Sequence, residues 1–161
     1  MIGSVRVVGT GRAGSAIAAR LAERGLTVRT GRETSADADL VLLAVPDSVI
    51  AEVAQQVPIG PWVAHVSGAT SLSALDPHER RFSLHPLQTI SLQRGAEQLD
   101  GAWAAVTFET DDARHEAEWL AITLGLRSFP LADADKPLYH AGAAIASNFL
   151  VTLYRAAARL L

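Results

Sequence analysis

The sequence contains no cysteine. Disulfide bonds, thiolate metal ligands and a cysteine nucleophile are therefore excluded. The chain also lacks any uninterrupted apolar run that approaches the ~20 residues needed to cross a bilayer. It opens on MIGSVRVVG, which predicts a strand and not the basic and then apolar leader of an exported protein. We therefore expect a cytoplasmic protein.

Clusters of positive charge are also missing. Lys and Arg number 14 against 17 Asp and Glu, the formal net charge is −3, and the arginines are scattered along the chain. This distribution argues against a nucleic-acid or anionic-membrane partner. A length of 161 residues, 49% of them hydrophobic and 19% charged, is typical of one folded domain with a packed core.

Short apolar runs alternate with segments of helical periodicity. We predict helices over 15–25, 47–57, 111–125 and 136–161, and strands over 5–9, 26–30, 38–46, 62–68, 81–87, 102–110 and 126–131. Strands separated by helices predict a doubly wound, mostly parallel α/β sheet of Rossmann-like type. We expect this dinucleotide-binding domain to span 1–132, and one long C-terminal helix to occupy 133–161.

A glycine-rich turn, GTGRAG, follows the first predicted strand and opens the first predicted helix. Such spacing supplies a tight turn, close approach to a pyrophosphate and close packing of helix on strand. The anion would lie on the free amides of the helix start. A tight turn without a ligand is the alternative. The turn predicts cofactor contacts from Gly9, Thr10, Gly11, Arg12, Ala13 and Gly14.

The end of the second strand decides which coenzyme is preferred. Many NAD sites place an acidic residue there to bind the adenosine ribose. This chain has Thr30, Gly31, Arg32 and Glu33. Arg32 is placed to pair with a 2′-phosphate, and Thr30 or Thr34 to donate to it, which favours NADP. NAD is the alternative if Glu33 binds the ribose. A solvated surface role for Arg32 also stays open.

Polar groups follow the central strands where those strands end. Ligands of open α/β sheets bind beyond the carboxyl ends of the strands, so these groups should converge on one crevice. For each group alone, a structural role is the alternative. No pair of histidines has metal-ligand spacing, so no metal site is expected. Strand three is expected to bring Ala44, Val45 and Pro46 to the cofactor, and strands four and five to bring His65, Ser67, Gly68 and His85 to the substrate.

The last helix carries Lys136, His140 and Asn148 at intervals of four or eight residues. This spacing places them on one ridge of the helix surface. Alanines, Gly142 and Ser147 border the ridge, and small side chains allow a ligand to come close. The ridge predicts a catalytic set, while a solvated ridge explains the same spacing.

Five stretches together resemble a known bacterial family: GTGRAGSAIA, ADLVLLAVPD, HVSGATSLSAL, FSLHPLQTI and KPLYHAGAAIASNFLVTLY. Its members join a Rossmann-like domain to a helical C-terminal domain of unknown function. They are similar to pyrroline-5-carboxylate reductase, 6-phosphogluconate dehydrogenase and β-hydroxyacid dehydrogenases. The resemblance implies an NADP-linked reductase of a small carbonyl or imine, with a 2-oxoacid such as ketopantoate as one substrate.

The resemblance also implies that a lysine and an asparagine on the first interdomain helix act on the substrate oxygen, which points to Lys136 and Asn148. The relatives continue with further helices, so we expect either that this chain is a truncated form or that a second subunit covers the last helix. Its apolar side chains predict a homodimer. The alternative to a reductase is a non-catalytic nucleotide-binding dimer.

Overall fold

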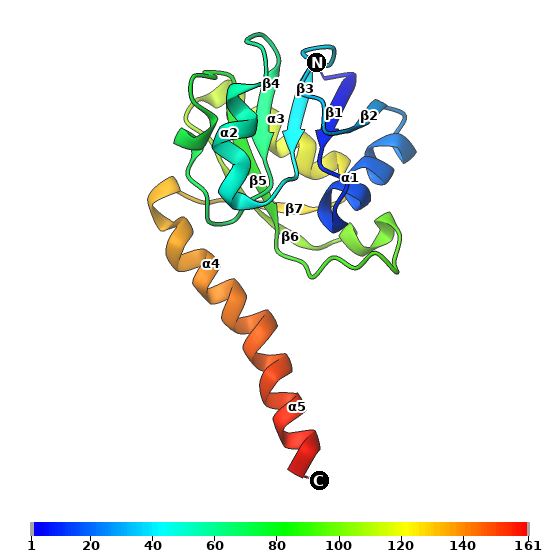
Figure 1. Ribbon diagram of the computed structural model, residues 1–161, viewed down its shortest axis with the longest axis vertical. Helices are drawn as coiled ribbons and strands as arrows, with labels where there is room; N and C mark the ends of the chain where they lie inside the picture. Colours follow the sequence, from blue (N-terminus) through cyan, green and yellow to red (C-terminus); the bar gives the residue numbers. More distant parts are fainter. Residues whose placement is uncertain (1, 161) are drawn as a thin grey trace.

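The computed structural model describes residues 2–160. In this part of the chain a seven-stranded sheet has the strand order β2-β1-β3-β4-β5-β6-β7 (Figure 1). All neighbouring strands are parallel except β5 and β6, which are antiparallel. The strands are β1 (Ser4–Val8), β2 (Thr27–Gly31), β3 (Leu40–Leu43), β4 (Trp62–His65), β5 (Arg81–Pro86), β6 (Trp103–Thr107) and β7 (Arg127–Pro130).

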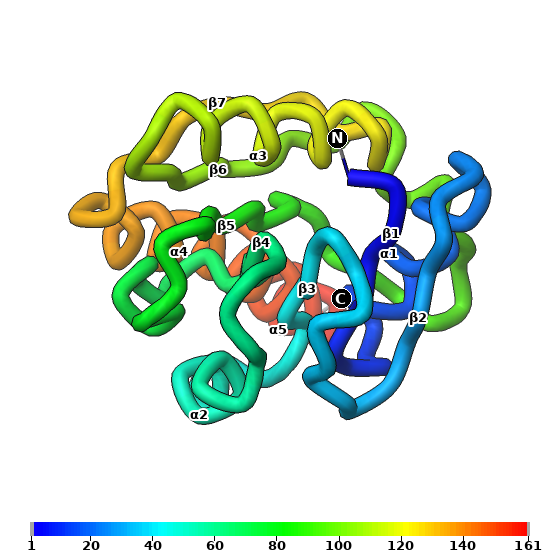
Figure 2. Tube along the Cα trace, turned by 90° about the horizontal axis from the view of Figure 1, so that it is seen from above, coloured from blue at the N-terminus to red at the C-terminus, as the bar shows by residue number. Residues whose placement is uncertain are grey.

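Helices cover both faces of this sheet, so the predicted doubly wound, mostly parallel arrangement is confirmed. α1 (Arg12–Glu23) and α3 (Asp111–Thr123) pack on one face, and α2 (Ile50–Gln55) packs on the other (Figure 2). Four short 3₁₀ turns complete the body of the protein: η1 (Asp47–Val49), η2 (Leu72–Leu75), η3 (Ala96–Leu99) and η4 (Asp133–Asp135).

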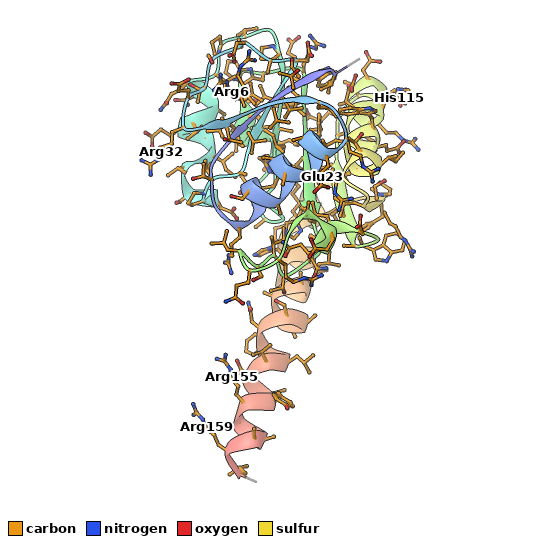
Figure 3. All side chains as sticks on the ribbon, turned by 90° about the vertical axis from the view of Figure 1, so that its right-hand side faces the viewer. Arg6, Glu23, Arg32, His115, Arg155 and Arg159 are labelled. Atoms are coloured by element: carbon orange, nitrogen blue, oxygen red, sulfur yellow. The ribbon has the colours of Figure 1, made fainter. Side chains whose placement is uncertain are left out.

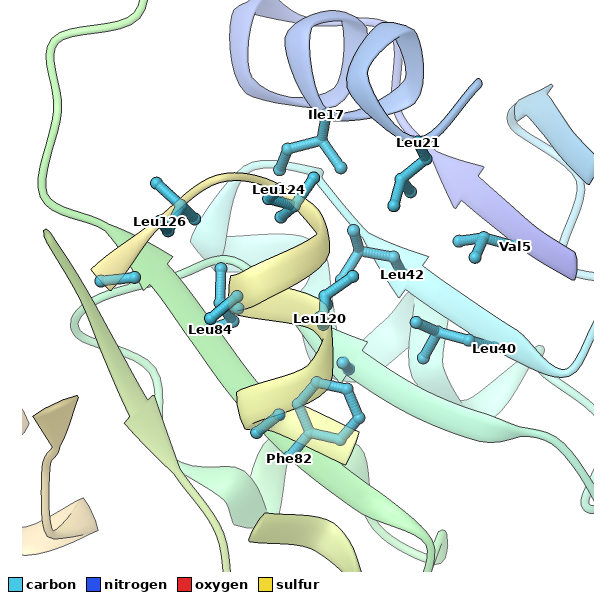
Figure 4. Close-up of a cluster of buried hydrophobic side chains, with 14 of the residues drawn as sticks. Val5, Ile17, Leu21, Leu40, Leu42, Phe82, Leu84, Leu120, Leu124 and Leu126 are labelled. Atoms are coloured by element: carbon cyan, nitrogen blue, oxygen red, sulfur yellow. The ribbon is translucent and has the colours of Figure 1, made fainter. Parts of the chain in front are cut away.

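The larger core lies between the sheet and the pair α1 and α3. Ile17 of α1 and Leu120 of α3 face Leu42 and Leu84 of the sheet, and all four side chains are fully buried (Figure 4). Every residue of β3 and β4 is buried, because central parallel strands are covered on both faces. This explains why these two segments read as continuous apolar runs in the sequence.

A loop, residues 32–39, joins β2 to β3. Arg6, buried in β1, holds it through two hydrogen bonds to the Asp37 carboxylate, at 2.8 and 2.7 Å. The Arg6 guanidinium keeps the pKa of Asp37 well below its usual range. The loop therefore has a fixed anchor at its base, while Arg32 near its start projects away from the body (Figure 3).

The closing helix extends away from the body of the protein (Figure 1). It consists of α4 (Lys136–Ala144), a π-helical turn η5 (Ile145–Phe149) and α5 (Leu150–Leu160). The long helix predicted from the sequence is confirmed, and the π turn within it is an addition that periodicity did not predict. Across residues 2–160, no helix has the length and apolar character that a bilayer span requires.

Candidate functional site

The glycine turn brings the start of α1 against the ends of β1 and β3. Gly9 has a φ of +113°, and a Cβ there would lie 2.3 Å from the Ala44 carbonyl oxygen. A Cβ on Gly14 would lie 2.1 Å from the Gly9 carbonyl oxygen. Both contacts are too short for any side chain, so the fold itself requires these two glycines.

Gly11 differs from its two neighbours in the turn. Its backbone is extended, with φ −72° and ψ −175°, and a Cβ there would meet no atom within 4 Å. Gly11 is also the N-cap of α1, and no side chain caps this helix end. Neither backbone strain nor packing explains a glycine here. The free space and the uncapped amides fit a phosphate group of a ligand.

The structure places the predicted cofactor residues around this turn. The Gly9 amide donates to the Gly31 carbonyl oxygen at 2.9 Å, which ties the turn to the end of β2. Ala44 contacts the turn from the end of β3, beside Val45. Among the remaining predicted residues, Ala13 is half-buried, and Thr10, Arg12, Thr30, Arg32 and Pro46 are exposed.

The two side chains proposed to select the coenzyme, Arg32 and Glu33, directly follow β2 and have different surroundings. The Glu33 carboxylate lies 3.6 Å from the guanidinium of buried Arg6, although the Glu33 side chain is 83% exposed. The Thr34 hydroxyl donates to the Gln56 carbonyl oxygen at 3.0 Å, so it is engaged within the protein. Arg32 is exposed and makes no ion pair with the described residues.

A cavity of about 590 Å³ lies between the carboxyl end of β5 and the closing helix. Its sheet side consists of residues 85–89. Small residues dominate its helix side, and His140 and Asn148 add an imidazole and an amide. No Lys, Arg, Asp or Glu lines it within the described chain. The helix contributes Tyr139, His140, Gly142, Ala143, Ala144, Ala146, Ser147 and Asn148.

His85, in β5, contacts the closing helix at this cavity. Its Nδ1 lies 2.7 Å from the Tyr139 hydroxyl, and its ring centroid lies 6.1 Å from that of His140. Burial, and next the charge of His140, lowers the pKa of His85 to about 4. Burial raises the pKa of Tyr139 to about 12. At neutral pH both side chains are therefore uncharged.

Gly68 makes room for the His85 ring. A Cβ on Gly68 would lie 2.8 Å from Nδ1 of His85 and 2.9 Å from two ring carbons. Gly68 itself does not line the cavity. The packing of the His85 ring explains why residue 68 is a glycine. Gly68 therefore contributes to the predicted substrate site by leaving room for His85.

His65 and Ser67 lie beneath the cavity and do not line it. His65 is fully buried, its Nδ1 accepts from the Ser67 amide at 3.2 Å, and its Nε2 has no partner in the described structure. Burial, and next the charge of Lys136, lowers the pKa of His65 to about 3. The Ser67 hydroxyl donates to Thr70 and accepts from the Ala69 and Thr70 amides. These contacts stabilise the loop after β4.

Lys136, the first residue of α4, is 1% exposed. Its ammonium donates to the Thr70 carbonyl oxygen at 2.7 Å and to the Ser83 hydroxyl at 2.9 Å. The Asp133 carboxylate lies 3.3 Å away, and that carboxylate also accepts from Ser71 and the Leu72 amide. An ammonium has three N–H donors, and Lys136 has three oxygen partners. This geometry favours a structural role over the predicted catalytic one.

The structure therefore divides the residues predicted for the substrate side. His85, His140 and Asn148 meet at the cavity, whereas Lys136, His65, Ser67 and Gly68 lie outside its lining. Tyr139 is a polar cavity residue that sequence reasoning missed. Its position next to His140, one residue off the predicted ridge, was the available signal, but only the fold shows that its hydroxyl reaches His85.

Comparisons with known proteins agree with this architecture. A model for a Rossmann-like domain matches residues 26–89, and a model for a domain of unknown function, DUF2520, matches residues 103–161. The chain is thus a Rossmann-like α/β protein with a DUF2520 segment. This combination fits the Rossmann-like NADP oxidoreductases that the sequence resembles. No curated protein matches.

Several solved structures share the fold. A candidate NADP oxidoreductase from Bacteroides fragilis has a TM-score of 0.80 at 16% identity, covering 98% of this chain and 71% of its own. A Thermotoga maritima protein has a TM-score of 0.75 at 23% identity, covering 97% and 68%. An Aquifex aeolicus prephenate dehydrogenase, in complex with hydroxyphenyl propionate and NAD+, has a TM-score of 0.71 at 13% identity, covering 84% and 62%.

Replacing Lys136 with methionine should destabilise the protein by about 3 kcal/mol, because the Asp133 carboxylate would be left without its cation and Ser83 without its donor. Urea unfolding followed by circular dichroism measures this change. Arg155→Met, at an exposed position on α5, removes the same charge and should change stability by less than about 0.5 kcal/mol. Equal stability of the two variants would contradict the structural role of Lys136.

Proposed function

We propose that the protein is a cytoplasmic NADP(H)-dependent oxidoreductase that transfers a hydride to the carbon of a small carbonyl or imine. Gly11 carries this proposal, because the empty space around it has no explanation within the protein and fits a dinucleotide phosphate. Similar structures include an NADH-preferring ketol-acid reductoisomerase from an uncultured archaeon, with a TM-score of 0.76 at 16% identity. That protein and the prephenate dehydrogenase act with nicotinamide coenzymes according to their names.

The residues of the glycine turn would hold the coenzyme pyrophosphate through the uncapped amides of α1. Thr30 and Arg32 would bind the adenosine side, and Ala44, Val45 and Pro46 would lie along the nicotinamide side. The coenzyme supplies the hydride when it is bound. The protein supplies binding, orientation and exclusion of water, and its own side chains supply the proton.

The cavity beside β5 would bind the substrate. His85 and His140 offer imidazoles at its sheet and helix sides, and Asn148 offers an amide from the π turn. Such turns occur often at functional sites. A cavity lined without Lys, Arg, Asp or Glu fits a substrate whose reacting group is a neutral carbonyl or imine. A 2-oxoacid would have to place its carboxylate near His140.

A non-catalytic nucleotide-binding dimer is a second candidate. The closing helix favours it, because this helix forms one side of the cavity and most of its residues are exposed to solvent. Turnover separates the two candidates. A panel of 2-oxoacids and cyclic imines, followed at the NADPH absorbance, should show NADPH consumption if the protein is a reductase. Coenzyme binding without turnover of any panel member would favour the second candidate.

Substituting Gly11 with alanine should weaken NADPH binding by at least about tenfold, because the new methyl group would occupy the phosphate position, while the fold should remain intact. Fluorescence titration of NADPH measures the first effect and urea unfolding the second. Gly3→Ala, at the start of β1, is the control, since its Cβ would approach only the Asp39 carboxylate, at 3.8 Å. Unchanged NADPH affinity in Gly11→Ala would refute the proposed coenzyme site.

Arg32 tests the preference for NADP. Arg32→Ala should weaken NADPH binding by about tenfold or more and leave NADH binding within about twofold, because only NADPH carries the 2′-phosphate. Isothermal titration with both coenzymes gives the ratio. Arg24→Ala, exposed at the end of α1, should change neither affinity. Equal losses for the two coenzymes would remove the argument for NADP.

We also propose that the protein forms a homodimer through the closing helix. Large apolar side chains along this helix are 49–89% exposed, and a stable interface buries about 800 Å² on each partner. Light scattering at micromolar concentration should give the mass of a dimer, and Leu153→Asp should give that of a monomer. A monomeric wild-type protein would contradict this proposal. The exposed apolar side chains of the closing helix are Leu138, Ile145, Phe149, Leu150, Val151, Leu153, Tyr154 and Leu160.

A further inference from the structure

The contact between His85 and Tyr139 links the sheet to the closing helix at the cavity. His85 stands near the end of β5, and Tyr139 stands in the first turn of α4. The Tyr139 ring packs on Phe129, with centroids 6.0 Å apart, and Phe129 lies 6.2 Å from Trp103. The His85 ring packs against Gly68. Two packed rings therefore meet at a hydrogen bond of 2.7 Å.

The direction of this hydrogen bond follows from the donors available. A neutral phenol has one hydrogen to donate, and the only partner of the Tyr139 hydroxyl in the described structure is Nδ1 of His85. If Nδ1 carried the hydrogen instead, the phenol hydrogen would have no protein acceptor. A neutral imidazole has one N–H and one acceptor nitrogen. With Nδ1 as the acceptor and the imidazole hydrogen on Nε2, the phenol hydrogen has a partner within the protein.

Nε2 of His85 is free to serve a ligand. No hydrogen bond to Nε2 occurs within residues 2–160, and Nε2 is not among the buried polar atoms that lack a partner. His85 is half-buried and lines the cavity. His65 differs, since its free Nε2 is buried where no ligand reaches it.

We propose that Tyr139 fixes His85 in the Nε2–H tautomer, so that His85 presents this hydrogen to the carbonyl oxygen of a substrate in the cavity. His85 is then a catalytic residue, and Tyr139 is a positioning residue that acts through it. This inference rests on the proposed reductase function. It assigns the acid to the neutral imidazole of His85 in place of Lys136 or His140, the two candidates on the helix ridge.

The step balances with a reduced nicotinamide dinucleotide as reductant. Hydride addition breaks the carbonyl π bond and leaves its electron pair on oxygen. The Nε2–H bond then breaks and the O–H bond of the alcohol forms, while the phenol proton of Tyr139 moves to Nδ1. Tyr139 recovers this proton when water protonates Nε2. A phenol with a pKa of about 12 is a stronger acid than an alcohol, so the transfer to the product oxygen is favourable.

The tautomer can be measured without substrate or coenzyme. In ¹⁵N NMR spectra near pH 7.5, assigned by comparison with His85→Gln, wild-type His85 should carry its hydrogen on Nε2. Tyr139→Phe keeps the ring and removes the hydroxyl, and should give a mixture of both tautomers. Tyr154→Phe, at an exposed position on α5, is the matched control and should behave as wild type. A wild-type hydrogen on Nδ1, or an unchanged tautomer in Tyr139→Phe, would overturn the proposal.

Kinetics then test the role in catalysis. Tyr139→Phe should lower kcat by at least about tenfold and leave KM within about twofold, and His85→Gln should lower kcat by about 10²–10⁴-fold. NADPH affinity should remain within about twofold in both variants. An unchanged kcat in Tyr139→Phe would overturn the positioning role. Failure of wild-type protein to bind NADPH would instead refute the proposed function, because the tautomer measurement stands independently of coenzyme binding.

Discussion

The Lys136 ammonium fixes the start of the closing helix to the sheet, and the cavity depends on this attachment. Its three N–H donors meet oxygens of the loop after β4, of β5 and of η4. Leaving a buried ammonium without these partners costs free energy, so the contacts hold the start of the helix in this direction. That direction brings the first turn of α4 over the end of β5 and places Tyr139 against His85. A compact ammonium suits this position better than a planar guanidinium, because its donors point in three directions.

Two kinds of construction form the proposed site. The coenzyme half consists mainly of backbone, because close packing of α1 on β1 and β3 leaves room only for glycine at positions 9 and 14. The substrate half consists of side chains from elements more than fifty residues apart, namely β5 and the closing helix. Burial keeps the imidazole and phenol at their junction uncharged. In the proposed reaction these two side chains would bind a neutral reacting group.

Features that depend on residues close together in the sequence could be predicted from it, whereas features that depend on distant residues could not. The strands β3 and β4 were predicted because burial on both faces leaves an uninterrupted apolar run. The glycine turn was predicted because its spacing reflects local geometry. The roles of Lys136 and Gly68 could not be predicted from the sequence. Spacing on a helix ridge and position in a strand do not show which residues form hydrogen bonds or packing contacts with distant parts of the chain. Lys136 shares its helix ridge with His140, yet only His140 lines the cavity.

By itself the sequence determined the α/β class, the position of the glycine turn and the edge of the sheet where polar groups collect, because each follows from short-range periodicity or from the order of strands. Only the tertiary structure decided which of those polar groups line the cavity. Hydrogen bonds between remote segments consume the donors of Lys136 and Ser67 and leave Nε2 of His85 free. Such competition for partners is a property of three-dimensional packing and leaves no local pattern in the chain.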